Sequence, residues 1–117
     1  MSNYDHPEEG SQVWAVESYA DANPGALYRI EFADGERYVA EFDTAYDSDN
    51  AGELEIEMDD PRYDEFHQVV FRIVGEFPGG WRPYNEFLSI DYRDFPERII
   101  DLDSQAMIYP AGGVVRT

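Results

Sequence analysis

Carboxylates are the side chains in this sequence most able to carry chemistry, and they are concentrated in one stretch. Residues 41–65 hold eleven Asp and Glu and a single Arg. Paired carboxylates can act as general acid and general base, so a hydrolytic or ligand-binding β-barrel with a pocket lined by Asp43, Asp47 and Asp91 is one hypothesis. Because acids are so common here, proximity alone marks no particular pair as buried or shifted in pKa. The sequence therefore favours a non-enzymatic protein over an enzyme.

The same stretch contains a candidate calcium loop. The run 47–52 reads Asp-Ser-Asp-Asn-Ala-Gly, which resembles the start of an EF-hand loop, where oxygen ligands alternate and Gly stands sixth. The resemblance implies calcium binding through the acidic loop 43–60. It ends at the fifth position, Ala51, and at the twelfth, Met58, where a bidentate Glu is required. Turn chemistry alone also favours this composition between strands, so no metal ligands are predicted.

Other catalytic constellations are missing from the sequence. Cysteine is absent, which excludes thiol nucleophiles, disulfides and Cys-ligated zinc. His6 and His67 lack metal-ligand spacing, and no Ser lies in a Gly-x-Ser-x-Gly turn. His67 is predicted as an edge or partly buried residue that a neighbour satisfies. No cofactor is expected.

A loop rich in Gly and Pro carries the residue types that dominate protein interfaces. Trp81, Arg82 and Tyr84 lie in the run 78–85, together with two Gly and two Pro. Trp, Tyr and Arg are enriched at interface hot spots, so these three are predicted binding residues. The alternative is that Trp81 and Tyr84 fold back to cap the open end of a barrel. We prefer this alternative, because large aromatic side chains are normally buried.

The net charge of the chain indicates which classes of partner it can bind. The chain has 26 acidic and eight basic residues, all of the basic ones Arg, and a net charge of −18. Such a surface repels phosphate backbones and anionic headgroups, so neither nucleic acid nor a membrane is an expected partner. It attracts basic proteins. The predicted acidic binding face consists of Asp47, Asp49, Glu53, Glu55, Glu57, Asp59 and Asp60.

These features together suggest a small acidic protein-binding domain for a basic partner. Its sharpest form is an immunity or inhibitor protein that neutralises a cationic enzyme. An acidic surface can also be an adaptation to salt, which would leave the charge without a binding role. No apolar run is long enough for a signal core or a membrane span, and a cytoplasmic location is expected.

The strongest structural signal is a hairpin over residues 26–43. Apolar side chains occupy even positions on both sides of Asp34-Gly35, and opposed residues of a hairpin share a face. An even-to-even register requires an odd loop, so the loop is predicted as residues 33–35 with Gly35 at positive φ. This register places Glu31 opposite Arg37.

Further alternating runs predict an all-β domain. Strands are expected at 13–17, 53–58, 66–77, 87–92, 98–103 and 106–109, with a bulge near Gly75 and at most a helical turn near 60–65. Together with the hairpin this gives about seven mostly antiparallel strands in a small, partly open barrel or roll. Residues 1–11 are predicted as a frayed acidic tail and residues 12–117 as a single β domain.

Overall fold

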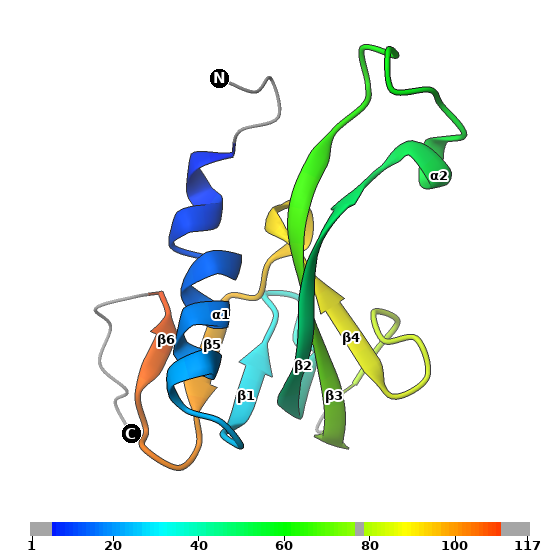
Figure 1. Ribbon diagram of the computed structural model, residues 1–117. Coiled ribbons are helices and arrows are strands. Elements are labelled where there is room, and N and C mark those ends of the chain that lie inside the picture. The colour runs from blue at the N-terminus through cyan, green and yellow to red at the C-terminus, as the bar shows by residue number, and fades with distance from the viewer. Residues whose placement is uncertain (1–5, 77–78, 111–117) are drawn as a thin grey trace.

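The computed structural model describes residues 6–76 and 79–110, and it is mostly β (Figure 1). Six antiparallel strands form one open sheet in the order β4-β3-β2-β1-β5-β6. The little helix present comprises one α-helix against the sheet, a short α-helix and two 3-10 helices. In chain order the elements are η1 (Pro7–Gly10), α1 (Val13–Ala22), β1 (Leu27–Glu31), β2 (Arg37–Asp49), α2 (Ala51–Leu54), β3 (Glu65–Glu76), β4 (Phe87–Ile90), η2 (Tyr92–Asp94), β5 (Arg98–Asp101) and β6 (Met107–Tyr109).

The predicted hairpin is confirmed as β1 and β2. Glu31 lies opposite Arg37, and the Phe32 N–H donates to the Glu36 carbonyl at 2.9 Å, which leaves residues 33–35 as the loop. Gly35 has φ 102°, a conformation that costs glycine little and other residues much. Local patterning therefore determined both the register and the turn.

The hairpin of β2 and β3 is much longer than its neighbours and extends beyond them as an arm (Figure 1). We define the arm as residues 44–69 and its tip as residues 50–64. The arm makes the molecule 47 Å long but only 30 by 25 Å across. The ladder is irregular at Asp43, and again where Val39 faces Gly75 but Ala40 faces Ile73. The second irregularity is the predicted bulge near Gly75.

The predicted strand at 13–17 is wrong, because this segment is the start of α1. Val13, Val16 and Ala20 are its buried residues, at a spacing of three and four that places them on one helical face. Over so few residues the same sequence also alternates, and the two periods cannot be told apart. Packing of this apolar face against the sheet determines the outcome.

The predicted strand at 53–58 is also wrong. Ladder pairing between β2 and β3 ends at Asp49 and Glu65, so the tip has no neighbouring strand to pair with. The chain forms α2 instead, followed by Glu55 at φ 54° and turns. Leu54 and Met58, which the alternation of a strand would place on its inner face, are 43% and 67% exposed.

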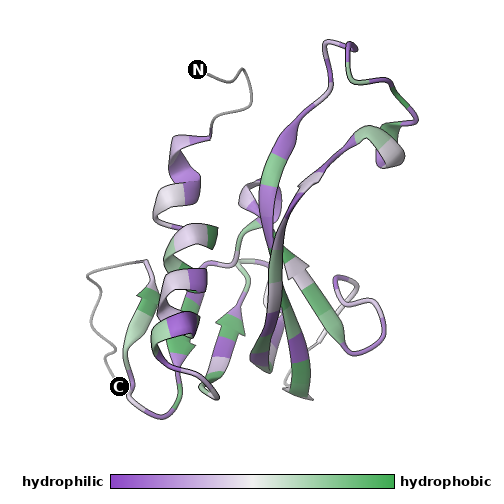
Figure 2. Ribbon diagram, viewed as in Figure 1, coloured by the Kyte–Doolittle hydropathy of each residue, from purple (hydrophilic) through white to green (hydrophobic). Residues whose placement is uncertain are grey.

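The core lies on the sheet face that α1 covers. Hydrophobic residues are concentrated on the body strands, whereas the arm is largely hydrophilic (Figure 2). The sheet remains open, with β4 and β6 at its edges, so the six strands of the described residues do not form the expected seven-stranded barrel or roll. The largest fully buried core side chains are Tyr28, Tyr38, Phe71, Ile30, Leu88, Ile90, Ile99, Val13, Val16 and Val69.

The segment before α1 packs onto the base of the arm. Residues 1–5 of the predicted tail lie outside the described part of the chain, whereas Pro7–Gly10 forms η1. Glu9 of η1 is buried and accepts the His67 backbone N–H at 2.8 Å. None of the helices among the described residues is long and apolar enough to cross a membrane.

Candidate functional site

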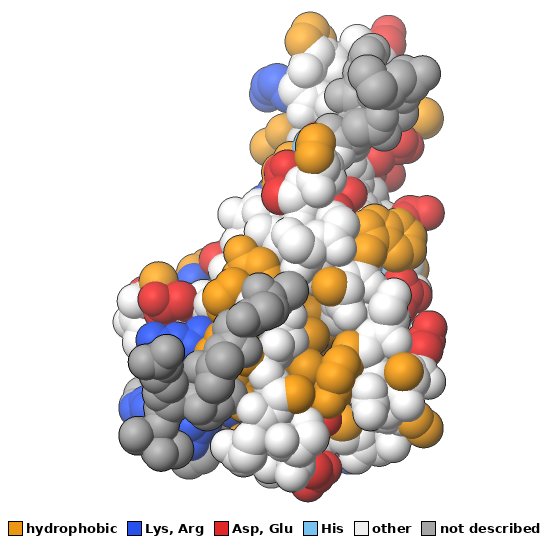
Figure 3. Space-filling view, turned by 90° about the vertical axis from the view of Figure 1, so that its left-hand side faces the viewer, with side chains coloured by type: hydrophobic (Ala, Val, Ile, Leu, Met, Phe, Trp, Pro, Cys, Tyr) orange, Lys and Arg blue, Asp and Glu red, His pale blue; other side chains and the backbone are white. Residues whose placement is uncertain are grey.

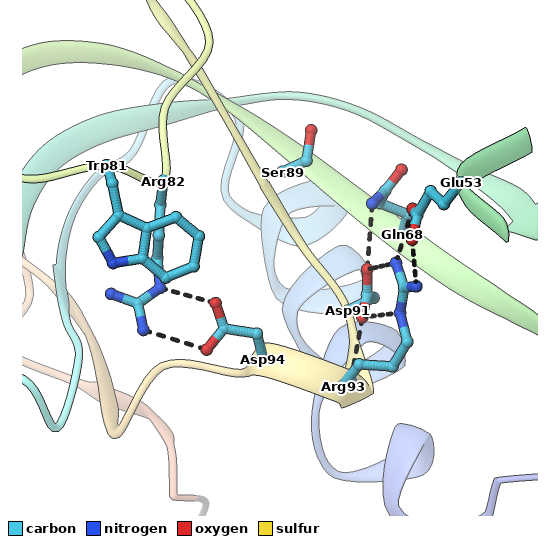
Figure 4. Close-up of a pocket in the computed structure, with 8 residues that line it drawn as sticks. All are labelled: Glu53, Gln68, Trp81, Arg82, Ser89, Asp91, Arg93 and Asp94. Atoms are coloured by element: carbon cyan, nitrogen blue, oxygen red, sulfur yellow. Dashed lines mark hydrogen bonds and ion pairs between the residues drawn. The ribbon is translucent and has the colours of Figure 1, made fainter. Parts of the chain in front are cut away.

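A groove brings together parts of both predicted binding regions (Figure 4). Its volume is about 370 Å³. Trp81 and Arg82 of the aromatic loop lie at one end, and Glu53 of α2 lies at the other, together with Arg93. The complete lining is Glu53, Gln68, Trp81, Arg82, Ser89, Asp91, Arg93 and Asp94.

Arg82 is a buried cation that joins three segments. Its guanidinium meets Asp34 and Glu36 of the β1–β2 turn at 2.9 and 2.8 Å, and Asp94 of η2 at 2.7 Å. The guanidinium also lies 3.9 Å from the centre of the Phe32 ring. Burial lowers the pKa of Arg82, but the hydrogen bonds that its guanidinium donates to Asp94 and Asp34 more than compensate and leave the pKa above its usual range. Arg82 therefore holds the loop in place.

Arg93 forms the second cation centre of the groove. Its Nε lies 3.0 Å from Asp91, and its Nη1 lies 3.0 Å from Glu53 of the tip. The guanidinium is 3.9 Å from the centre of the Phe66 ring. Hydrogen bonding to Asp91 is the main reason that the pKa of Arg93 is raised. The ion pair between Arg93 and Glu53 holds α2 against η2, and these two elements form the far wall of the groove.

Trp81 and Tyr84, in the loop that we call the aromatic loop (residues 79–85), are not folded back as they would be to cap the open end of a barrel. Trp81 is 74% exposed and Tyr84 is 80% exposed. One face of the indole covers the Arg82 guanidinium, at 4.8 Å from the ring centre. Of the three predicted binding residues, Trp81 and Tyr84 are therefore accessible to a partner. Arg82 is instead committed to internal ion pairs, because its side chain is only 11% exposed.

Some carboxylates of the predicted acidic face bind other residues of the chain, and others do not. Asp60 pairs with Arg62, which lowers the pKa of Asp60 to about 2 through side-chain and backbone hydrogen bonds. Asp49 accepts the Ala51 N–H at 3.0 Å. Glu53 pairs with Arg93, and Asp47 contacts His67. The other three carboxylates of the predicted face are exposed and have no side-chain partner among residues 6–76 and 79–110: Glu55, Glu57 and Asp59.

A cluster around His67 was not predicted. His67 is buried, with Nδ1 at 3.0 Å from Asp47 and Nε2 at 2.8 Å from Glu17, and its ring stacks on Trp14 at 3.7 Å. Carboxylates only accept hydrogen bonds, so both contacts are satisfied together when each ring nitrogen carries a proton. The cluster ties α1 to the arm. The sequence contained no local sign of it, because Glu17 and His67 are fifty positions apart.

The residues proposed for the alternative catalytic and calcium sites have separate contacts in the structure. Asp91 lines the groove and is bonded to Gln68 and Arg93, Asp47 contacts His67, and Asp43 lies at the ladder irregularity. Within the described residues, no group of three or more His, Cys, Asp and Glu is arranged to hold a metal ion. The structure offers no support for a shared carboxylate centre in this part of the chain.

The groove combines an exposed indole with an excess of negative charge. Five carboxylates surround its two guanidiniums, counting the partners of Arg82 and Arg93. An aromatic face beside carboxylates attracts a cationic side chain, through both charge and the ring quadrupole. No family model, curated protein or solved structure matches the chain, so this arrangement is interpreted from its own geometry.

Proposed function

We propose that this chain is a noncatalytic domain that binds a basic protein, using the groove and the neighbouring arm tip. The observation that carries the proposal is the exposure of Trp81 beside carboxylates that outnumber the local guanidiniums. A large exposed aromatic residue next to a desolvated pocket is typical of an interface hot spot. Tyr84, on the same loop, extends the accessible aromatic surface.

The charge of the arm supports the same partner class. Glu55, Glu57 and Asp59 are free to meet Lys or Arg side chains, and the exposed Leu54 and Met58 add apolar contact area between them. Complementary charge speeds encounter, and the aromatic contacts slow dissociation. A cationic enzyme held in an inhibited state, as by an immunity protein, is the sharpest form of this proposal. The same charge disfavours nucleic acid, and we place the interaction in the cytoplasm.

A comparative capture experiment tests this function. Immobilised wild-type protein is incubated with lysate of the source organism at low and at high salt, beside Trp81→Ala and Val74→Ala. Val74 is also exposed but does not line the groove. We expect a basic protein to be retained at low salt and released at high salt, less strongly by Trp81→Ala and unchanged by Val74→Ala. Retention of no basic protein, or equal retention by all three baits, would contradict the proposal.

A further inference from the structure

The sheet face opposite α1 carries four of the eight arginines of this acidic protein. Because opposed residues share a face, the register defines rows across the strands. One row contains Arg98, Glu31 and Arg37, and the next contains Ile100, Arg29, Val39 and Gly75. A third contains Leu27, Glu41, Arg72 and Phe87. We call Arg29, Arg37, Arg72 and Arg98 the arginine face.

The four arginines differ in how they are paired, and Arg72 is the most firmly held, because its Nε donates a hydrogen bond to Glu41 at 2.8 Å. The side chains of Arg29, Arg72 and Arg98 are 42%, 42% and 50% exposed. Arg29 and Arg98 share Glu31 at 3.7 and 3.8 Å, beyond hydrogen-bond distance. Arg37 is exposed and has no ion-pair partner in the described part of the chain. With only Glu31 and Glu41 in the same rows, this face is positive although the chain is strongly negative.

The positive face lies on the body, away from the acidic arm. Figure 3 shows basic side chains gathered low on the body, with the arm rising at the top. Beside Arg29 in the second row the surface is small and apolar, because Gly75 carries no side chain and a Cβ there would lie 3.6 Å from the Cβ of Val39. The arginine face therefore includes a small, half-buried apolar patch formed by Val39 and Gly75.

The arm tip has the complementary pattern. Leu54 and Met58 are exposed there, flanked by Glu55, Glu57 and Asp59. The acidic and apolar side chains of the tip are complementary to the arginines of the face and to the apolar patch beside Arg29. The tip cannot reach the face of its own molecule, because Val39 and Asp49 are ten residues apart along β2, about 33 Å of extended chain.

We propose that the arginine face is the docking site for the arm tip of a second copy of this chain. A two-fold arrangement lets each copy supply one arm and one face, which closes the assembly as a dimer. The arm itself favours this occupant, because an isolated two-stranded ribbon is marginally stable and gains from being covered. At physiological salt the screening length is about 8 Å, so contacts across the interface outweigh the repulsion of distant acids.

The oligomeric state of the purified full chain tests the inference. Sedimentation velocity at physiological salt, from low micromolar to millimolar protein, should show a reversible monomer–dimer equilibrium. Arg37→Glu should raise the dissociation constant by about tenfold or more, because like charges then meet at the contact. The double variant Glu55→Arg/Glu57→Arg should do the same. Mixing the two variants should restore the dimer, because each weakened contact regains opposite charges.

Arg62→Glu supplies the matched control, because it makes the same change of charge on the arm tip. If the tip docks on the arginine face, Arg62→Glu should keep or strengthen the dimer. If net charge alone controls association, Arg62→Glu should weaken the dimer as Arg37→Glu does, and that result would overturn the inference. A monomer at all concentrations would also overturn it. Circular dichroism establishes folding, and Arg37→Gln replaces Arg37→Glu if the latter unfolds. These outcomes are independent of capture of a basic protein.

Discussion

Replacing Arg82 with Met measures how strongly one buried cation holds the groove together. The Arg82 and Glu36 side chains are 11% and 7% exposed and lie 2.8 Å apart. Removing one partner of a buried pair costs about 3–5 kcal/mol, because the other charge is left uncompensated. Asp34 and Asp94 are about half exposed and add little. Met retains the apolar stem that covers Phe32.

We expect Arg82→Met to lower the free energy of unfolding by about 3 kcal/mol, the low end of that range. The reason is that Glu36 keeps the hydrogen bond donated by the Tyr38 hydroxyl at 2.5 Å. For a urea slope of about 1.5 kcal/mol per molar, the midpoint should fall by about 2 M. Far-UV circular dichroism is the appropriate signal, because Trp81 covers the guanidinium and its fluorescence would report the substitution itself.

Two variants make this experiment decisive. Arg62 binds Asp60 through two nitrogens, but the Arg62 side chain is 63% exposed. Arg62→Met should therefore leave the urea midpoint unchanged. The double variant Arg82→Met/Glu36→Gln should recover much of the loss, because it removes the stranded charge. If Arg82→Met proves as mild as Arg62→Met, or if Glu36→Gln recovers nothing, the argument from burial is refuted.

Two further predictions concern buried polar groups. Burial, and after it Asp101, raises the pKa of Tyr28 to about 12, so the unfolded chain ionises first above about pH 10. The contribution of Tyr28 to stability, complete below about pH 10, should then fall by up to about 1.4 kcal/mol per pH unit towards pH 12, and urea midpoints should decline less steeply in Tyr28→Phe by that amount. The rest of the decline comes from Tyr19, Tyr63 and Tyr92, whose pKa values are also raised. His67→Ala should lower the free energy of unfolding by about 2 kcal/mol in urea titration, because Glu17 and Asp47 lose their donor. Asp47→Asn should change little, since that carboxylate is 87% exposed, and an equal loss in both variants would contradict a buried cluster.

The parts of the fold that sequence predicted are those determined by local interactions. The β1–β2 hairpin follows from alternation on both sides of Asp34-Gly35, and positive φ at Gly35 follows from the loop length. The segments 13–17 and 53–58 fail for the opposite reason. Five or six residues fit both periods, and the outcome depends on whether a sheet or another strand lies beside them in space.

The site shows the same division. Composition made Trp81 and Tyr84 candidate interface residues, but the position of their loop depends on Arg82 binding carboxylates that lie up to 48 positions away. Only the first row of the arginine face could be predicted from sequence, because the hairpin register places Glu31 opposite Arg37. Its other rows depend on pairing with β3 and β5, which short-range patterns do not specify.

The two proposed contacts share the arm tip, so each excludes the other. A basic partner that binds Glu55 and Glu57 must displace the arginine face of the other copy, and its apparent affinity falls by the fraction of tips already covered. The dimer is in turn dissolved by any partner that binds the free tip more tightly. This competition gives the arginine face a physical role beyond folding, because partly exposed ion pairs such as those with Glu31 contribute little to stability.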